Sequence, residues 1–231
     1  MHYGRLKFAP PWLSWLVLSG GLWAGVLLSA APPDPPDSGL ANTLQGMEDK
    51  YNRLKTVRMR FVQIYRQNRQ VLRQEEGTLY LRKPGQMRWE YESPEPKLFL
   101  TDGRLLTLYV PGENRATQMA VKEADDLRTP LRFLLGRLRF DKEFQTLERS
   151  RDFPPLETGN LVVKGVPRQM ADRVAWMAFE VGEELKIRRL IIEEPGGVQT
   201  EFRFEDETGN LSLPAQLFRF QPPAGTEIVR Q

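Results

Sequence analysis

The residues of this chain with the most obvious potential for catalysis are its carboxylates, some of which stand in adjacent pairs. Such pairs include Glu75-Glu76, Asp125-Asp126, Glu183-Glu184 and Glu193-Glu194. General acid and base catalysis by two carboxylates requires both groups to face the same reacting bond. Neighbouring residues on an extended strand point to opposite faces, so an adjacent pair does not direct both groups to one point. We therefore expect these pairs to be solvated charges at turns and strand edges.

Other catalytic machinery is missing from the sequence. The chain has no cysteine, and its one histidine is His2, within an apolar N-terminal segment. A thiol nucleophile, a Cys/His zinc site and a histidine base are therefore excluded from the remainder of the chain. No serine lies in a G-x-S-x-G sequence, and the glycines form no GxxxxGK[ST] or GxGxxG phosphate loop. The sequence indicates a protein without enzymatic activity, metal or cofactor.

Basic residues gather in one stretch, although the formal net charge of the whole chain is only +3. From Lys50 to Glu90 only three acidic residues oppose Lys50, Arg53, Lys55, Arg58, Arg60, Arg66, Arg69, Arg73, Arg82, Lys83 and Arg88. Such a stretch suits an anionic partner, and it is also typical of a solvated strand face. No RNA-binding signature, helix-turn-helix or zinc knuckle accompanies the charge, which argues against nucleic acid.

The first element expected in the folded chain is a helix followed by a strand. Apolar residues recur at helical spacing after Ser38, at Leu40, Leu44, Met47, Tyr51 and Leu54. This stripe predicts a helix that packs on a sheet. In the strand that follows, Val57, Met59 and Phe61 are expected to face inward, and Arg58 and Arg60 outward.

A β-meander is predicted between Gly77 and Pro111. Its reversals are Lys83-Pro84-Gly85, Ser93-Pro94-Glu95-Pro96 and Asp102-Gly103. In its second strand, Met87, Trp89 and Tyr91 alternate with charged residues, so one face is apolar. A further strand is expected at residues 117–121.

The second half of the chain begins with Thr129-Pro130, a good helix start, and a short apolar helix through Leu131, Phe133, Leu134, Leu135 and Leu138. Strands are then expected at residues 161–164, 174–181, 186–193, 199–205 and 217–220. So many antiparallel strands joined by short turns close, or nearly close, on themselves. The predicted fold is mainly β, of the α+β kind: an incomplete antiparallel β-barrel, or strongly curved sheet, enclosing a hydrophobic cavity covered by a few short helices.

In their order and spacing these elements resemble the outer-membrane lipoprotein carrier protein family (LolA). The resemblance rests on Lys83, Pro84, Trp89, Pro94, Asp102-Gly103, Tyr109-Val110-Pro111, Phe61-Val62-Gln63, Thr129-Pro130-Leu131, Leu217-Phe218-Arg219-Phe220 and Pro222-Pro223-Ala224-Gly225. It extends over nearly the whole chain after about Leu40. It implies a periplasmic carrier that binds the acyl chains of lipoproteins in a hydrophobic cavity and transfers them from the inner to the outer membrane.

The apolar strand faces and the resemblance together assign residues to this cavity. The expected lining is Met59, Phe61, Leu79, Leu81, Met87, Trp89, Tyr91, Leu98 and Leu100. Methionines such as Met59, Met87 and Met119 suit a cavity that adapts to variable chains. The resemblance implies a lid made of Leu131, Phe133, Leu134 and Leu135.

The resemblance also implies a latch at the mouth of the cavity. Lys83 stands where the family usually has an arginine that holds the lid helices. Lysine lacks the five N–H donors of an arginine guanidinium group. The latch is therefore expected to be weaker here or to be supplied by Arg82.

The domain organisation follows from the N-terminus. Arg5 and Lys7 precede an uncharged apolar run over residues 8–31, so residues 1–31 are expected to be a signal peptide or an uncleaved N-terminal anchor. Residues 32–37 form a proline-rich spacer, and residues 38–231 form one lipoprotein-carrier-like β-barrel domain. Either form of the N-terminus places this domain outside the cytoplasm.

The partners implied by the resemblance are lipoproteins, bound through their acyl chains, an inner-membrane ABC-type lipoprotein releasing complex and an outer-membrane lipoprotein receptor. The carrier is expected to be a monomer that binds no nucleic acid, with the basic stretch as a docking face for the loading complex. Two alternatives stay open. The cavity could take a free lipid or glycolipid, as a tethered binding or sensor module, or the barrel could have a packed core and no ligand.

Overall fold

The computed structural model describes residues 38–121, 136–170 and 172–231 of the chain. They belong to one compact unit, Pro36–Gln231. The expected signal peptide or anchor, the spacer, the Asp125-Asp126 pair and the four lid residues lie outside the described residues. Within the described part of the chain, no helix has both the length and the apolar character needed to cross a bilayer.

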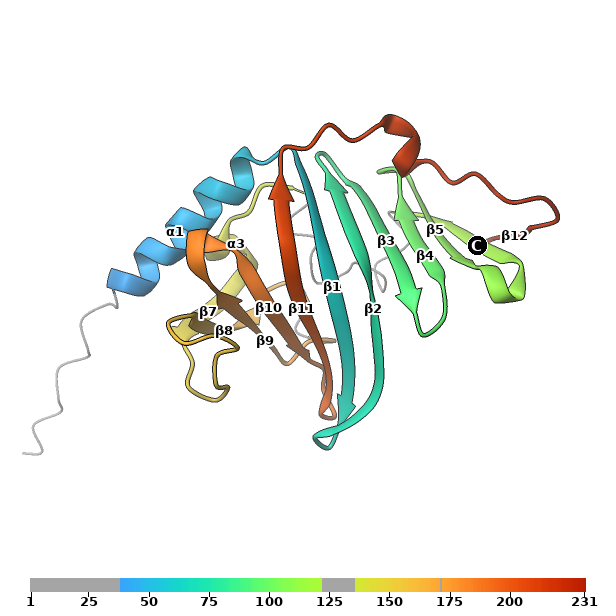
Figure 1. Cartoon of the computed structure of the whole chain (residues 1–231). Coiled ribbons are helices and arrows are strands. Elements are labelled where there is room, and N and C mark those ends of the chain that lie inside the picture. The colour runs from blue at the N-terminus through green and yellow to red at the C-terminus, as the bar shows by residue number, and fades with distance from the viewer. Residues whose placement is uncertain (1–37, 122–135, 171) are drawn as a thin grey trace, which may run out of the picture. The chain divides into compact units, whose positions relative to one another are not determined.

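The fold consists mostly of strands, with a few short helical elements (Figure 1). The helical elements are α1 (Ser38–Arg53), η1 (Pro111–Glu113), α3 (Phe140–Glu143), η3 (Glu183–Leu185) and η4 (Ala215–Phe218). The strands are β1 (Thr56–Gln67), β2 (Gln70–Arg82), β3 (Gln86–Ser93), β4 (Lys97–Thr101), β5 (Leu105–Val110), β6 (Arg115–Ala120), β7 (Phe144–Arg149), β8 (Leu161–Pro167), β9 (Trp176–Val181), β10 (Ile187–Glu193), β11 (Val198–Gly209) and β12 (Glu227–Arg230).

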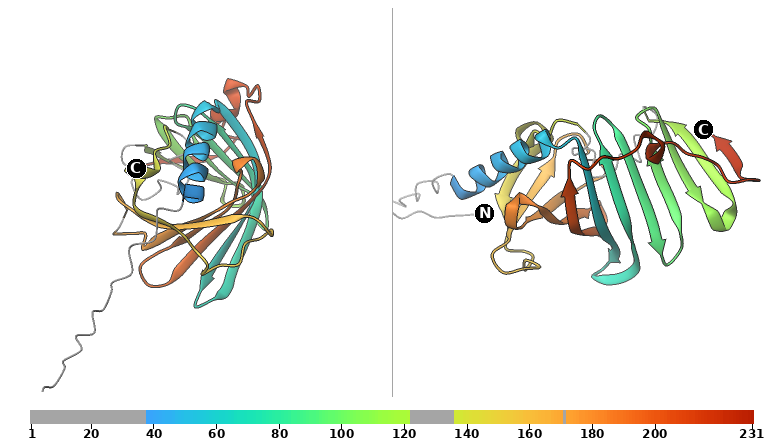
Figure 2. Two further views of the ribbon diagram at one scale, coloured as in Figure 1. Left: turned by 90° about the vertical axis from the view of Figure 1, so that its left-hand side faces the viewer. Right: turned by 45° about the horizontal axis from the view of Figure 1, so that its top comes forward.

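The described strands form a single 12-stranded sheet in the order β12-β6-β5-β4-β3-β2-β1-β11-β10-β9-β8-β7. Strand β1 lies between β2 and β11 and so joins the two halves of the chain in one sheet. The neighbours are antiparallel except β12 and β6, which run parallel. The sheet ends at β7 and β12 and curves without closing (Figure 2), which confirms the predicted class of a strongly curved, incomplete barrel.

Helix α1 lies on the concave side of the sheet, as its apolar stripe predicts (Figures 1 and 2). Its residues Leu40, Met47 and Tyr51 are buried. On β1, Met59 and Phe61 are buried and Arg58 is exposed, so the predicted alternation of this strand is confirmed. We call the sheet face that carries Met59 and Phe61 the concave face, and its opposite the convex face.

One strand prediction, over residues 217–220, is wrong. The chain forms the 3₁₀ turn η4 there, with Phe218 fully buried on the convex side, and the last strand is β12 instead. The guanidinium of Arg82 lies 4.8 Å from the centre of the Phe218 ring. The alternation of Phe218 and Phe220 imitates a strand, but it arises because an irregular segment packs across the sheet. Strand β7 also was not predicted.

Candidate functional site

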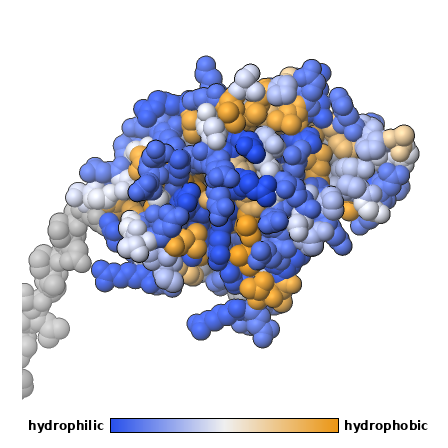
Figure 3. Space-filling view, in the orientation of Figure 1, coloured by the Kyte–Doolittle hydropathy of each residue, from blue (hydrophilic) through white to orange (hydrophobic). Residues whose placement is uncertain are grey.

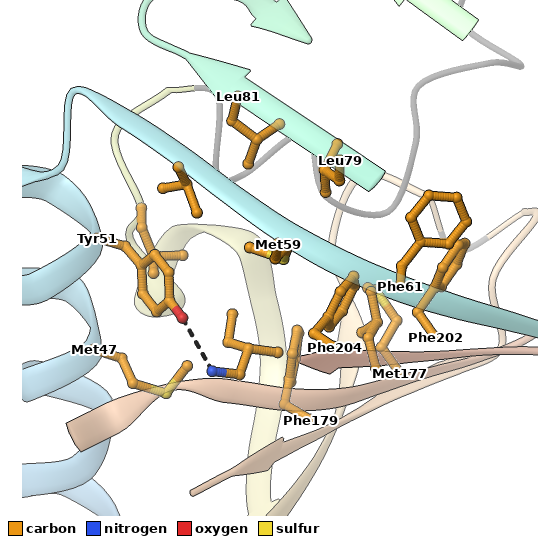
Figure 4. Close-up of a cluster of buried hydrophobic side chains, with 14 of the residues drawn as sticks. Met47, Tyr51, Met59, Phe61, Leu79, Leu81, Met177, Phe179, Phe202 and Phe204 are labelled. Atoms are coloured by element: carbon orange, nitrogen blue, oxygen red, sulfur yellow. Dashed lines mark hydrogen bonds between the residues drawn. The ribbon is translucent and has the colours of Figure 1, made fainter. Parts of the chain in front are cut away.

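The concave face carries a continuous apolar surface built by both halves of the sheet and by α1 (Figure 4). Strands β1, β2 and β3 contribute one half, and β9, β10 and β11 contribute the other. The buried members of these strands and of α1 include Met47, Tyr51, Met59, Phe61, Leu79, Leu81, Met87, Trp89, Met177, Phe179, Leu190, Ile192, Phe202 and Phe204. Alternation along each strand places these side chains on one face, and the curvature brings the two halves toward each other.

Aromatic rings form the centre of this surface. The rings of Phe61 and Trp89 meet edge to face with centroids 4.6 Å apart, and Trp89 lies 5.3 Å from Phe202. Phe202 stacks on Phe204 along β11. The indole N–H of Trp89 donates to the sulfur of Met87 at 2.9 Å. The indole N–H of Trp89 therefore has a hydrogen-bond partner although it lies among apolar side chains.

Seven of the nine residues predicted to line the cavity lie together on the concave face. Six of them are no more than 2% exposed: Met59, Phe61, Leu79, Leu81, Met87 and Trp89. The seventh, Tyr91, is partly buried at the margin of the same cluster.

Leu98 and Leu100 do not join them. They pair with Glu90 and Arg88 on β3, whereas Phe99 pairs with Trp89, so both leucines point to the convex face. Leu98 lines a groove of about 460 Å³ there, beside the C-terminal segment. The residue that sequence reasoning missed is Phe99, which packs against the concave-face cluster. A shift of one residue in register exchanges the two faces of a strand, and Leu98-Phe99-Leu100 has no polar residue to reveal it.

The concave-face residues of the second half were also missing from the predicted lining. Met177 and Phe179 on β9 face Ile192 and Leu190 on β10 across a regular antiparallel ladder. The sequence does contain a signal for this half, since Phe202 and Phe204 on β11 alternate with Glu201, Arg203 and Glu205. Only the pairing of β1 with β11 shows that this second apolar face continues the first.

Three polar contacts hold α1 against the sheet. The phenol of Tyr51 donates to Glu207 and accepts from the backbone N–H of Ile187 at 3.0 Å (Figure 4). Lys50 pairs with the same Glu207 carboxylate at 2.6 Å. Burial, followed by the charge of Glu207, raises the pKa of the Tyr51 phenol well above its ordinary value. Helix α1 is thus fixed by a protonated phenol and a shared carboxylate.

Lys83 makes a further polar contact with α1. Its ammonium donates to the backbone carbonyl of Tyr51 at 2.6 Å, near the C-terminal end of the helix. Cations favour this end of a helix because its last carbonyls have no partners within the helix. Burial lowers the pKa of Lys83. The predicted lid lies outside the described residues, so the described partner of Lys83 is α1.

Arg82 does not take the place of a latch on the concave side. Its guanidinium points to the convex side, where it donates to the carbonyl of Leu213 at 3.3 Å and covers Phe218. The described contacts of Arg82 thus lie on the face away from α1, because consecutive strand residues face opposite ways. Arg82 instead fastens the C-terminal segment to β2.

One end of the concave face is polar. The carboxylate of Glu75 is 1% exposed and accepts from Lys97 at 2.7 and 2.8 Å and from Arg73. The expectation that Glu75-Glu76 is a solvated pair is thus wrong for Glu75, because two cations compensate its burial. The opposite facing of the pair is confirmed, since Glu75 pairs with Gln63 and Glu76 with Val62.

Two tyrosines extend this polar end toward the aromatic centre. Tyr91 donates to the side-chain carbonyl of Gln63 at 2.7 Å, and the amide of Gln63 donates to Tyr65. Burial is the main cause that raises the pKa of both phenols, and the charge of Glu75 adds to it. The concave face therefore has an apolar centre and a hydrogen-bonding end.

Ion pairs compensate much of the basic stretch. Within the described part of the chain, five of its eleven cations pair with carboxylates, in Lys50–Glu207, Arg60–Glu92, Arg66–Glu201, Arg73–Glu75 and Arg88–Glu90. Two of these acids, Glu201 and Glu207, come from β11, far along the chain. The local excess of positive charge in the sequence is therefore smaller on the folded surface.

The arrangement on this face suits binding. Among the described residues, no group of three or more His, Cys, Asp or Glu residues could hold a metal ion. What the concave face offers is a broad apolar surface with hydrogen-bonding groups at one end. Proteins with such a surface on the inner face of a curved sheet form a class that can shield a hydrophobic ligand from water.

Comparison with known proteins gives the family. Residues 52–221 match the family model described as outer membrane lipoprotein carrier protein LolA. The chain belongs to this family. An outer-membrane lipoprotein carrier protein of Nitrosospira multiformis is 26% identical over 181 residues, covering 77% of this chain and 83% of the relative. One of Legionella pneumophila is 25% identical over 187 residues, covering 80% and 88%.

The fold also matches solved structures. A conserved protein of Thermus thermophilus aligns with a TM-score of 0.53 at 14% identity, covering 84% of this chain and 99% of that one. The likeness at this identity concerns the curved sheet and its helices alone.

Proposed function

We propose that this protein is a periplasmic carrier that holds the acyl chains of lipoproteins against its concave face and transfers them from the inner to the outer membrane. The observation that carries the proposal is the apolar surface that runs from Trp89 through Phe61 to Phe204 across both halves of the sheet. Membership of the lipoprotein carrier family supports it.

The free energy of acyl-chain transfer explains why such a surface is needed. Each methylene moved out of water contributes about 0.8 kcal/mol, so long acyl chains cross an aqueous compartment only inside an apolar enclosure. A carrier must also release its cargo. Met59, Met87 and Met177 supply flexible thioether side chains on the concave face, which repack around chains of different shape at low cost.

The rest of the proposal concerns other proteins and the parts of this chain that lie beyond the described residues. Leu131, Phe133, Leu134 and Leu135 form a lid over the concave face, and residues 1–31 direct export. An inner-membrane ABC-type releasing complex loads the carrier, and an outer-membrane receptor unloads it. The carrier acts without chemistry of its own, as a monomer.

Two adjacent residues of β4 provide a matched test of the binding face. Phe99 packs against the concave-face cluster, and Leu98 points to the convex face, while both are half-buried. We expect Phe99→Gln to weaken the binding of a fluorescent fatty-acyl probe about tenfold, because roughly 1.4 kcal/mol of apolar contact is lost. The measurement is a fluorescence titration of the purified full chain.

The control is Leu98→Gln, which is expected to leave the affinity within about twofold. Equal losses in the two variants would contradict binding at the concave face. The absence of probe binding to the unchanged protein would contradict the carrier function itself.

A further inference from the structure

The β1–β2 hairpin carries the most exposed large aliphatic side chains of the described surface. Val71 is 57% exposed and Leu72 is 62% exposed, and all of residues 67–74 belong to the exposed class. Both residues belong to β2, and a register shift opposite them, between Tyr65 and Arg66, interrupts the usual alternation of the strand. Figure 3 shows hydrophobic side chains next to charged ones at the lower end of the view, where this hairpin lies in Figure 1.

The tip of the β1–β2 hairpin extends beyond β3, the strand next to β2 in the sheet. The ladder between β2 and β3 begins only at Glu76, opposite Ser93, so residues 70–75 of β2 pair with β1 alone. The register of β1 and β2 then shifts between Tyr65 and Arg66, which leaves Leu72 without an opposite residue. This bulge redirects the strand, so neither Val71 nor Leu72 is buried against the sheet.

The turn of the hairpin has an arginine where glycine would fit more easily. Asn68 and Arg69 have φ values of 49° and 67°, as a two-residue hairpin turn requires. Asparagine tolerates this left-handed region, whereas a long side chain is strained in it. Strained backbone at an exposed tip is characteristic of functional positions. The presence of an arginine at position 69 therefore calls for a functional explanation.

The charge of the hairpin tip is positive. Arg66 and Arg73 flank it and pair with Glu201 and Glu75, which lie deeper in the fold. Arg69, at the turn, makes no ion pair with any other residue in the described ranges. Two aliphatic side chains beside a free guanidinium match the boundary between lipid headgroups and acyl chains. A projecting tip offers no concave surface for a partner's side chains, but a deformable bilayer surface can receive it.

We propose that residues 67–73 dock on the surface of an anionic lipid bilayer, with Val71 and Leu72 in the headgroup region and Arg69 on the phosphates. Docking in this way brings the polar end of the concave face, at Glu75 and Tyr65, toward the bilayer from which acyl chains come or to which they go. The contact is weak and reversible, because two aliphatic side chains and one cation supply little free energy. It does not require that the concave face hold a ligand.

The test uses the absence of cysteine from the chain. The full chain with Gln70→Cys, labelled at that position with an environment-sensitive dye, is mixed with phosphatidylcholine vesicles with and without phosphatidylglycerol. We expect a blue shift of the emission with the anionic vesicles. Leu105→Cys provides the control, because Leu105 is 45% exposed and lies at the opposite end of the strands. A local probe also separates the hairpin from any membrane affinity of residues 1–31.

Two variants in the Gln70→Cys background assign the effect. Arg69→Gly removes the charge and relieves the backbone, so we expect unchanged or raised thermal stability with about fivefold weaker vesicle binding. Val71→Ser with Leu72→Ser is expected to weaken binding at least about tenfold.

Three results would overturn the proposal. They are no shift with anionic vesicles, an equal shift with neutral vesicles or at Leu105→Cys, and a shift that survives both variants. Uptake of the acyl probe, measured separately, reports on the carrier function and is expected to be the same in all of these proteins.

Discussion

At the scale of single residues, the charge of Glu75 depends on its two cations. Its carboxylate is buried on the concave face and accepts two hydrogen bonds from Lys97. Lys97 also lies 4.1 Å from the centre of the Tyr91 ring. Loss of Lys97 therefore leaves the buried Glu75 carboxylate with Arg73 as its only remaining cation among the described residues, and breaking a buried ion pair is costly.

We expect Lys97→Met to lower the free energy of unfolding by about 3 kcal/mol, measured by urea denaturation. Lys164→Met is the control, because the Lys164–Asp152 pair is exposed and is expected to contribute less than about 1 kcal/mol. Adding Glu75→Gln to Lys97→Met should recover most of the loss, since the buried charge is then gone. A loss no larger than that of Lys164→Met would show that Glu75 is adequately solvated.

Alkaline unfolding should report on three buried phenols. The folded-state pKa values of Tyr51, Tyr65 and Tyr91 are raised above the ordinary value of 10.0, so the folded protein retains protons that the unfolded chain loses. Their contribution to stability is complete below about pH 10 and is lost as the pH rises toward the folded-state values. We expect phenolate absorbance from these residues to appear together with unfolding, followed by circular dichroism. The prediction would be contradicted if the wild type and Tyr51→Phe formed the same amount of phenolate before they unfolded.

The register of β4 shows why residue-level prediction succeeded only in part. On β3 the charged residues Arg88, Glu90 and Glu92 mark the outward face, so Trp89 is placed correctly from the sequence alone. On β4 the run Leu98-Phe99-Leu100 is apolar throughout, and Leu100 is buried although it points to the convex face, so the usual contrast between faces is missing. Alternation cannot identify the inner face of a strand that is covered on both sides.

At the scale of elements, α1 is held by polar contacts that its apolar stripe does not reveal. The spacing of Leu40, Met47 and Tyr51 is sufficient to predict a helix on a sheet. The contacts of Tyr51 with Glu207 and Ile187 join positions more than 130 residues apart, and no local pattern encodes them.

Removal of the Tyr51 hydroxyl tests this fastening. We expect Tyr51→Phe to lower the free energy of unfolding by about 1–3 kcal/mol, because the N–H of Ile187 and the carboxylate of Glu207 lose a partner. Hydrogen exchange of the α1 amides should accelerate by a comparable free energy. Tyr80→Phe, on the convex side of β2, should change stability by less than about 0.5 kcal/mol. Equal effects of the two substitutions would show that the helix rests on its apolar contacts alone.

The segment after β11 is the element that the sequence misrepresents most. Its aromatic residues predict a strand, yet Phe218 fills a site between the sheet and the Arg82 guanidinium. Arg88 also donates to the carbonyl of Leu217 at 3.0 Å, so two arginines of the meander determine the path of a distant segment. Such tertiary contacts override the local preference of Phe218 and Phe220 for extended structure.

At the scale of the whole molecule, the fold class was predictable because it depends on the number of strands and their short turns. The order of the strands was not, because it depends on the pairing of β1 with β11. That pairing also unites the two apolar faces, and it places Glu201 and Glu207 beside the basic stretch. The candidate surface and the compensation of its surrounding charges are thus products of one long-range ladder.

The central claim is that the concave face carries the acyl chains of lipoproteins. Mass spectrometry, under native and denaturing conditions, of the protein purified gently from the envelope of its own host tests it most directly. The proposed function predicts a co-purified triacylated lipoprotein on a chain that begins near Pro32. A free lipid or glycolipid on an uncleaved chain, or an empty chain that also takes up no acyl probe, would contradict it.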